Sequence, residues 1–165
     1  MTKALIVACA APPVLRISEL IASMKQRGWQ ASLVLTPTAS SWIDPEGLAC
    51  NTNALVRVNP RMPYESKDDF GSPDLIVVAP LTFNTLNKWA AGISDTLALG
   101  ILNEALGSPV PIRAVTCIKE SLTLHPAYAN SVRLLQASGV NFIDPEPMTI
   151  RAEDGMLNFI WDQLL

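Results

Sequence analysis

Short apolar runs alternate with amphipathic segments along this chain. Five runs are bounded mainly by glycine, proline or polar residues, and most are rich in β-branched side chains: 4–10, 31–36, 74–80, 112–118 and 140–143. Unbroken apolar runs of this length are typical of strands that are covered on both faces of a parallel sheet. We therefore expect five parallel strands at these positions.

Segments with helical periodicity separate the strands. Residues 14–28 place their apolar side chains near one face and stop at Gly28, a common residue at a helix C-terminus. The same pattern predicts helices over 84–107 and 125–139, and a last helix over 155–165. Alternating strands and helices predict an α/β fold with a doubly wound parallel sheet, a Rossmann-like or flavodoxin-like three-layer sandwich.

One stretch departs from this regular pattern. Residues 43–73 contain four prolines and a charge cluster, and they predict a surface excursion with one short strand at 54–58. Loops of this length often cover functional sites. The chain has 165 residues and no tandem repeat, so we expect one domain over residues 1–165.

Charge and cysteine content narrow the function classes. The 12 basic and 15 acidic residues form no long block of one sign, so the sequence predicts neither a nucleic-acid partner nor a membrane surface. A small-molecule or peptide-derived ligand is favoured instead. Cys9, Cys50 and Cys117 are odd in number and lack metal-ligand spacing, which favours reduced thiols in a cytoplasmic protein without a metal. The apolar start before Pro12 suits a buried strand better than a signal peptide, so we expect the mature chain to begin here.

Small polar residues follow the predicted strands. In an open α/β sheet, ligands bind beyond the carboxyl ends of the strands, where this chain reads CAAPP, TPTASSW, PLTFNT and CIKES. Thr36, Thr38 and Ser40 offer hydroxyls at a helix start, which suits a phosphate at the positive end of the helix dipole. Ordinary N-capping is the alternative for these residues and for Asn84. The chain contains no glycine-rich dinucleotide fingerprint and no P-loop sequence.

Several motifs together resemble one known family. The segment APLTFNTLNKWAAGISDTLAL resembles the PASANT segment of the homo-oligomeric flavin-containing cysteine decarboxylases, which include phosphopantothenoylcysteine decarboxylase. Residues 3–43 are similar to the first βαβ unit of that family, and residues 125–143 are similar to a later helix and strand. The resemblance spans about residues 3–147.

This resemblance implies an FMN cofactor and a homotrimer or a multiple of it. Small hydroxyl and amide side chains after the first strands suit the phosphate and the polar ring edge of FMN. The cofactor-binding residues expected from the strand ends and the resemblance are Cys9, Ala10, Ala11, Thr36, Thr38, Ser40, Pro80, Thr82, Asn84, Thr85 and Cys117. The apolar helix after PLTFNT would supply surface for subunit contact.

Three departures from the family pattern bear on catalysis. Active members carry a histidine shortly before the third strand of the main sheet, where this chain reads RMPYESKDDFGSPD. Lys119 stands at the asparagine position of the PxMNxxMW motif, and a lysine lacks the directional hydrogen bonding of an amide. The glycine-rich flap is replaced by DPEPMTIRAEDG. We therefore expect no standard cysteine decarboxylation.

Substitute catalytic residues are few. His125 suits either a helix entry or general acid–base catalysis. Glu65, in a cluster with Lys67, Asp68 and Asp69, is either a base or part of a solvated loop. Lys119 is a third candidate, as a carboxylate-binding charge.

Trp42 and Trp89 are expected to have different surroundings. Trp42 corresponds to an aromatic residue of the flavin turn in the family, whereas Trp89 suits the core or a subunit interface.

Two main function classes stay open from the sequence. The first is an FMN-binding protein without catalysis, such as a regulatory subunit or cofactor sensor. The second is an FMN-dependent enzyme, such as a decarboxylase-like lyase, that acts on a small or peptide-derived carboxylate or thiol with a divergent residue set. A prenylated-flavin enzyme of similar architecture is a third, weaker alternative, since it predicts a more basic phosphate site.

Overall fold

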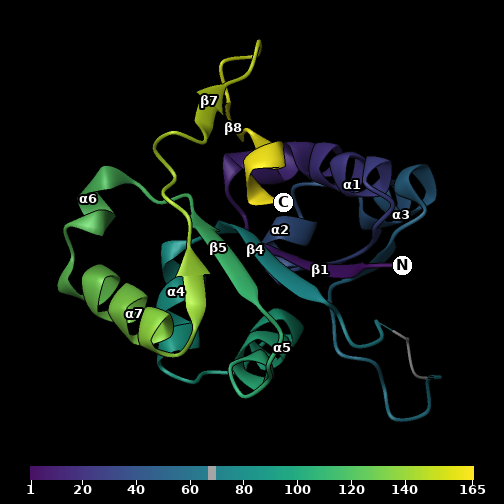
Figure 1. Ribbon diagram of the computed structural model, residues 1–165, viewed down its shortest axis with the longest axis horizontal. Helices are drawn as coiled ribbons and strands as arrows, with labels where there is room; N and C mark the ends of the chain where they lie inside the picture. Colours follow the sequence, from purple (N-terminus) through teal and green to yellow (C-terminus); the bar gives the residue numbers. More distant parts are fainter. Residues whose placement is uncertain (67–69) are drawn as a thin grey trace.

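A parallel sheet forms the centre of the molecule in the computed structural model, which describes residues 1–66 and 70–165 (Figure 1). Among these residues the sheet has six strands in the order β3-β2-β1-β4-β5-β6. The strands are β1 (Lys3–Ala8), β2 (Gln30–Leu35), β3 (Leu55–Arg57), β4 (Leu75–Leu81), β5 (Ile112–Thr116) and β6 (Val140–Phe142). The predicted doubly wound α/β fold is confirmed, with the short strand of the excursion present as β3.

Burial of the sheet interior explains why the strands appear in the sequence as apolar runs. All seven residues of β4 are buried, and Val7 of β1 is paired in register with Val34 and Val78 on its two sides. The chain runs outward from β1 to β3 and then returns to place β4 against the other side of β1. This reversal is a topological switch point, the usual ligand position in an open α/β sheet.

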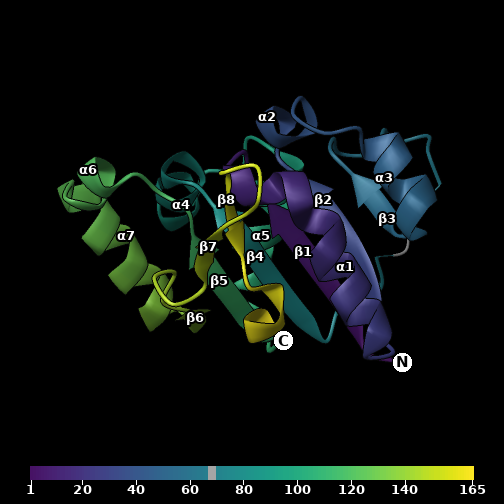
Figure 2. The same cartoon turned by 90° about the horizontal axis from the view of Figure 1, so that it is seen from above.

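Helices cover both faces of the sheet (Figure 2). On one face, η1 (Pro12–Arg16), α1 (Ile17–Gln26) and η2 (Trp161–Leu164) belong to one apolar cluster with the sheet, and α3 (Pro45–Thr52) packs beside α1. On the other face, α4 (Phe83–Ala90), α5 (Leu97–Ala105) and α7 (Pro126–Ala137) contribute to a second cluster. Single turns α2 (Pro37–Ser40) and α6 (Glu120–Thr123) follow β2 and β5.

The predicted long helix over 84–107 is wrong, because the segment forms two helices. Helix α4 ends at Ala90, Gly92 adopts a left-handed φ of 72°, and Thr96 caps the start of α5 by accepting a hydrogen bond from the Leu99 N–H at 3.2 Å. A left-handed residue interrupts a helix, and glycine adopts that conformation without strain. The apolar stripe of the sequence therefore continues across the break between α4 and α5.

The predicted last helix over 155–165 is also wrong. The segment contains strand β8 (Leu157–Phe159), which pairs antiparallel with β7 (Thr149–Arg151), and then the 3-10 turn η2. This hairpin projects beside η1, at the start of α1 (Figure 1). An ion pair between Arg16 and Asp154 at 3.1 Å ties the hairpin to the start of α1.

The excursion over 43–73 holds one element that the sequence reading missed. Helix α3 begins where the Asp44 side chain accepts a hydrogen bond from the Glu46 N–H at 3.1 Å, with proline at the first helical position. Asp followed by Pro is a usual helix start, so this signal was available. Lys67, Asp68 and Asp69 of the predicted charge cluster lie outside the described residues.

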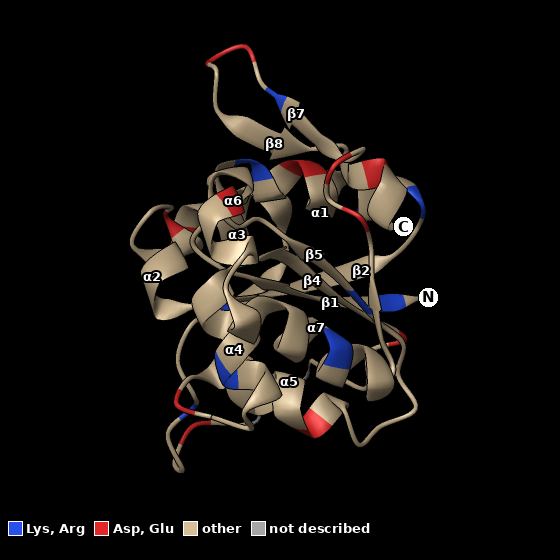
Figure 3. Cartoon of the chain, turned by 90° about the vertical axis from the view of Figure 1, so that its left-hand side faces the viewer, with Lys and Arg blue, Asp and Glu red and all other residues tan. Residues whose placement is uncertain are grey.

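Charged side chains are spread over the molecule. Lysine and arginine positions alternate with acidic ones over the helices and loops in Figure 3. In the described ranges, no helix has the length and apolar character needed to cross a bilayer.

Candidate functional site

A cavity of about 420 Å³ opens at the switch point, where β1, β2 and β4 end. Its size falls within the usual range for small-molecule sites, about 300–1,000 Å³. It is called the first cavity below, and its lining residues are Ala10, Thr36, Pro37, Thr38, Thr82, Asn84, Thr85, Lys88, Thr96 and Leu99. Six of the eleven predicted cofactor-binding residues therefore meet in one place: Ala10, Thr36, Thr38, Thr82, Asn84 and Thr85.

The start of α4 supplies the wall on the β4 side. Thr82 is the N-cap residue, but its hydroxyl makes no capping bond and donates instead to the Thr85 hydroxyl at 3.3 Å. Asn84 lies inside the first turn, is exposed, and forms no side-chain hydrogen bond within the described part of the chain. Asn84 is therefore not the helix cap, and its amide is free to bind a ligand.

The turn after β2 supplies the opposite wall. The Thr36 hydroxyl accepts from the Ala39 N–H at 3.3 Å and so caps α2. Helix α2 has only four residues, which is too short to build up a useful macrodipole. Phosphate binding at this turn stays a prediction, to which so short a helix adds only a small dipole contribution. The exposed Thr38 hydroxyl, with no bond among the described residues, keeps its donor for a ligand.

Lys88 and Thr96 complete the cavity and were not predicted. Lys88 lies one helical turn beyond Asn84, so the two side chains share a face of α4. Its ammonium group pairs with the Asp95 carboxylate at 2.5 Å while its side chain stays 31% exposed. Lys88 is the cationic residue among those that line this cavity. The i, i+4 spacing from Asn84 was the signal that could have found it.

Cys9 lies beneath the cavity rather than in its wall. The residue is 1% exposed, and its N–H donates to the Pro80 carbonyl at 2.9 Å. Burial raises the pKa of the Cys9 thiol above its ordinary value, and hydrogen bonding with Thr85 and Thr82 lowers that pKa in part. The thiol is therefore neutral and packed, so it supports the floor instead of touching a ligand.

Four other predicted residues lie outside the first cavity. Ala11 and Pro80 are buried, and the Ser40 hydroxyl donates a hydrogen bond to the Pro37 carbonyl at 2.7 Å. Cys117 lines a different cavity beyond β5.

The three catalytic candidates do not converge. His125 begins α7, where its Nδ1 accepts from the Ala127 N–H at 3.1 Å and its ring meets the Phe83 ring edge-on at 5.7 Å. Lys119 is exposed ahead of α6. Glu65 accepts from the Met62 N–H at 3.0 Å within its own turn. None of the three lines the first cavity.

The two tryptophans occupy different surroundings. Trp89 is 1% exposed, and its indole N–H donates to the Leu102 carbonyl at 3.1 Å, so it belongs to the core. Trp42 is 45% exposed after α2.

A second cavity, of about 480 Å³, lies where β5 ends. Its walls come from the turn after β5, from α6 and α7, and from the segment that leads into the β7–β8 hairpin. The segment read as a shortened flap thus folds as a hairpin, which contributes Thr149 and Leu157 to this cavity.

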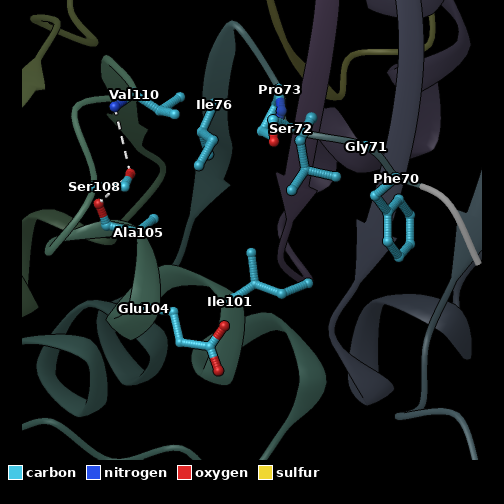
Figure 4. A pocket seen from close by; sticks show the side chains of 11 residues that line it. Phe70, Gly71, Ser72, Pro73, Ile76, Ile101, Glu104, Ala105, Ser108 and Val110 are labelled. Carbon is cyan, nitrogen blue, oxygen red and sulfur yellow. Dashed lines mark hydrogen bonds between the residues drawn. The ribbon is translucent and has the colours of Figure 1, made fainter. Parts of the chain in front are cut away.

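A third cavity, of about 370 Å³, lies away from the carboxyl ends of the strands (Figure 4). Ile101 and Glu104 of α5 line this cavity together with Ile76 of β4 and residues 70–73. Its lining is mostly apolar, with Glu104 as the charged side chain. Its position beside the early part of β4 separates it from the site at the carboxyl edge. No cluster of three possible metal ligands occurs in residues 1–66 and 70–165.

Comparison with known proteins identifies related sequences and folds. The family model described as Flavoprotein matches residues 2–161. A cysteine/cysteine sulfinic acid decarboxylase from an unknown prokaryotic organism is 35% identical over 72 residues, 44% of this chain and 19% of that protein. The coenzyme A biosynthesis bifunctional protein CoaBC of Bacillus subtilis (strain 168) is 26% identical over 138 residues, 80% of this chain and 33% of that protein. This chain spans about a fifth to a third of the length of these curated relatives.

The solved structures agree on the fold. The FMN-dependent cysteine decarboxylase SpaF superimposes with a TM-score of 0.78 at 18% identity, covering 99% of this chain and 93% of that chain. At this identity, the likeness establishes a shared architecture.

Proposed function

The chain belongs to the Flavoprotein family, and from this premise we propose that it binds FMN in the first cavity. The observation that carries the proposal is the convergence of hydroxyl, amide and ammonium donors at the switch point of the sheet. The name of the similar structure SpaF, an FMN-dependent cysteine decarboxylase, favours FMN over other flavins.

The donor set of the cavity fits FMN. A phosphate and a ribityl chain need several hydrogen-bond donors, and Thr38, Thr96 and the Lys88 ammonium provide them. A flavin ring needs apolar contacts and a polar partner at its edge, and Leu99 and the Asn84 amide meet that need. Asn84 and Thr38 have no competing side-chain bond within the described ranges, so binding would cost them no existing contact.

The chain's own contribution is to bind and orient the cofactor. Bound FMN supplies a two-electron acceptor or donor for a substrate. Lys88 places a positive charge in the cavity, held by Asp95, and Thr82 and Thr85 fix each other's hydroxyls at the floor. The buried Cys9 thiol hydrogen-bonds with Thr85 and Thr82 and so supports the floor from beneath.

We further propose that this protein does not oxidatively decarboxylate C-terminal or phosphopantothenoyl cysteine. That reaction needs an acid–base group beside the flavin and a directional holder for the carboxylate. His125, Lys119 and Glu65 all lie outside the wall of the first cavity, and Lys119 offers a point charge in place of an amide.

Cofactor content tests the flavin proposal. Protein as purified, or after reconstitution with excess FMN, is expected to be yellow and to release FMN on denaturation, identified by mass. A protein that stays colourless and shows no thermal shift with FMN refutes the proposal.

Turnover tests the catalytic proposal separately. FMN-loaded protein is incubated with cysteine-terminated peptides and with phosphopantothenoylcysteine. Mass spectrometry is expected to show no product that has lost carbon dioxide and two hydrogens. Multiple turnovers on either substrate contradict this part of the proposal.

The assembly is proposed from the family resemblance, as a homotrimer or a multiple of it. The segment after PLTFNT, expected to supply subunit contacts, buries Leu86, Trp89, Leu99 and Leu102 within the chain itself. Ile93 between α4 and α5 is 42% exposed. Sedimentation at micromolar concentration is expected to show the trimer mass, and a stable monomer removes the proposal.

A further inference from the structure

The second cavity lies next to the first across the carboxyl edge of β4 and β5. The Cys117 N–H donates to the Leu81 carbonyl at 2.9 Å, and Leu81 directly precedes Thr82 of the first cavity. The ends of β4 and β5 therefore separate a ligand in the first cavity from a ligand in the second cavity. The second cavity is lined by Thr116, Cys117, Ile118, Glu120, Thr123, Tyr128, Pro145, Glu146, Thr149 and Leu157.

One hydroxyl in this lining has no hydrogen-bond partner among the described residues. Thr116 is 5% exposed, and its side chain forms no hydrogen bond with any residue in the described ranges. The hydroxyl oxygen is not among the fully buried unpaired atoms of the described residues, so it stays accessible from the cavity. The Thr116 hydroxyl is thus available to a ligand that enters the cavity.

The thiol beside it carries no charge. Cys117 is half-buried, and burial raises the pKa of its thiol above the ordinary value. The thiol therefore adds a soft, neutral surface near Thr116. Apolar contact comes from Ile118, Pro145 and Leu157.

Two carboxylates supply the charge of the cavity. Glu120 comes from α6 and Glu146 from the segment after β6. Neither carboxylate forms a hydrogen bond or an ion pair with the residues that the structure describes, and no lysine or arginine is among the lining residues. Lys119 is exposed and lies outside the lining.

We propose that the second cavity binds a small organic amine, with its ammonium group toward Glu120 and Glu146 and its apolar body against Ile118, Pro145 and Leu157. Charge complementarity favours a cation here and disfavours a carboxylate. The Thr116 hydroxyl and the Tyr128 phenol provide neutral polar contacts. The substrate class read from this cavity is therefore an amine rather than an acid.

The use of this amine as a flavin substrate rests on the proposed function, whereas its binding to the cavity does not. Amine binding and FMN binding are therefore measured separately.

Three probes of matched shape test the charge preference: phenethylamine, phenethyl alcohol and hydrocinnamate. Cys117 serves as the reporter in the full chain carrying Cys50→Ser, because Cys50 is an exposed thiol and Cys9 is buried. The amine is expected to slow alkylation of Cys117 by iodoacetamide, the alcohol to slow it less, and hydrocinnamate to leave the rate unchanged. Calorimetry on the same protein is expected to give the same order of affinities.

Charge-neutral variants test the two carboxylates. Because both side chains are partly exposed and screened, we expect the dissociation constant of the amine to rise about threefold in Glu120→Gln or Glu146→Gln, and about tenfold in the double variant. Glu153→Gln, on the hairpin turn and outside the cavity lining, is the matched control and should leave amine binding unchanged. The double variant should also bind FMN as the parent does.

Two results overturn the inference. One is hydrocinnamate binding as tightly as the amine, and the other is amine binding that is unaffected in the double variant. Amine binding to a protein that takes up no FMN supports this inference and refutes the proposed function. FMN uptake without amine binding supports the proposed function and refutes this inference.

Discussion

Replacing Lys88 by methionine tests the flavin site most directly. The substitution keeps the length of the side chain and removes the cation found among the described residues that line the first cavity. A hydrogen bond to a charged group contributes about 1.5–3 kcal/mol, and the 31% exposure of Lys88 places the expected loss near the lower end, at about 1–2 kcal/mol. This loss corresponds to a rise of roughly five- to thirtyfold in the dissociation constant of FMN.

The assay is titration of FMN fluorescence with apoprotein, at low and high salt. Lys119→Met is the matched control, because it removes the same charge from a lysine that lies outside the first cavity. Asp95→Asn keeps the Lys88 charge and removes its partner, so it should weaken FMN binding less than Lys88→Met. The salt dependence of the parent should diminish in Lys88→Met. Equal FMN affinity in Lys88→Met and the parent, or equal weakening by the control, refutes the assignment.

Three further outcomes are expected. Thr85→Val removes a hydroxyl from the cavity floor, so the dissociation constant of FMN should rise about fivefold in the same titration; an unchanged value contradicts its role. Trp89→Ala empties a fully buried site and breaks the bond to Leu102, so urea unfolding should show a loss of about 3–5 kcal/mol; a loss below about 1 kcal/mol places Trp89 outside the core. Burial raises the pKa of folded Cys9 above 9.0, so the unfolded chain releases this proton first and stability should fall as pH rises above 9.0, a fall that Cys9→Ala reduces; in the folded protein, Cys50 should be alkylated long before Cys9.

The fold was predictable because burial on both faces leaves a simple signature. β4 is apolar throughout and contains Ile76, Val77 and Val78, and a short apolar run rich in β-branched side chains favours a buried strand. Boundaries within helical segments were less predictable. The stripe that runs through 84–107 is continuous, and the break depends on the left-handed Gly92 and the Thr96 cap, which are local events within an unbroken pattern.

Residues 155–165 were not predictable from local sequence, because their structure depends on contacts outside the segment. Residues 157–159 form a strand because β7 lies opposite them, and the Asn158 amide donates to Glu19 of α1 at 3.0 Å. The Glu19 partner is 139 residues away in the chain, so a helical reading of the local apolar spacing had nothing to correct it.

The candidate site was predictable as far as it depended on strand ends. Thr36, Thr82 and Asn84 come directly after strands, and parallel strands bring their carboxyl ends to one edge. Lys88 and Thr96 enter the cavity from α4 and from the start of α5, so their positions depend on how these helices pack. A search limited to strand ends could not reach them.

The pairing of β4 with β5 also divides the polar residues of this edge into two sets. Thr82 and Thr85 lie on one side with Lys88, while Thr116 and Cys117 lie on the other with two carboxylates. The first set has a cation and suits a phosphate-bearing cofactor, and the second has only anions and suits an ammonium group. With opposite charges in adjacent cavities, the two proposed ligands, FMN and an organic amine, would not compete for the same contacts. A strand-end position therefore indicates that a residue belongs to this edge, whereas the charge of its neighbours indicates which ligand it serves.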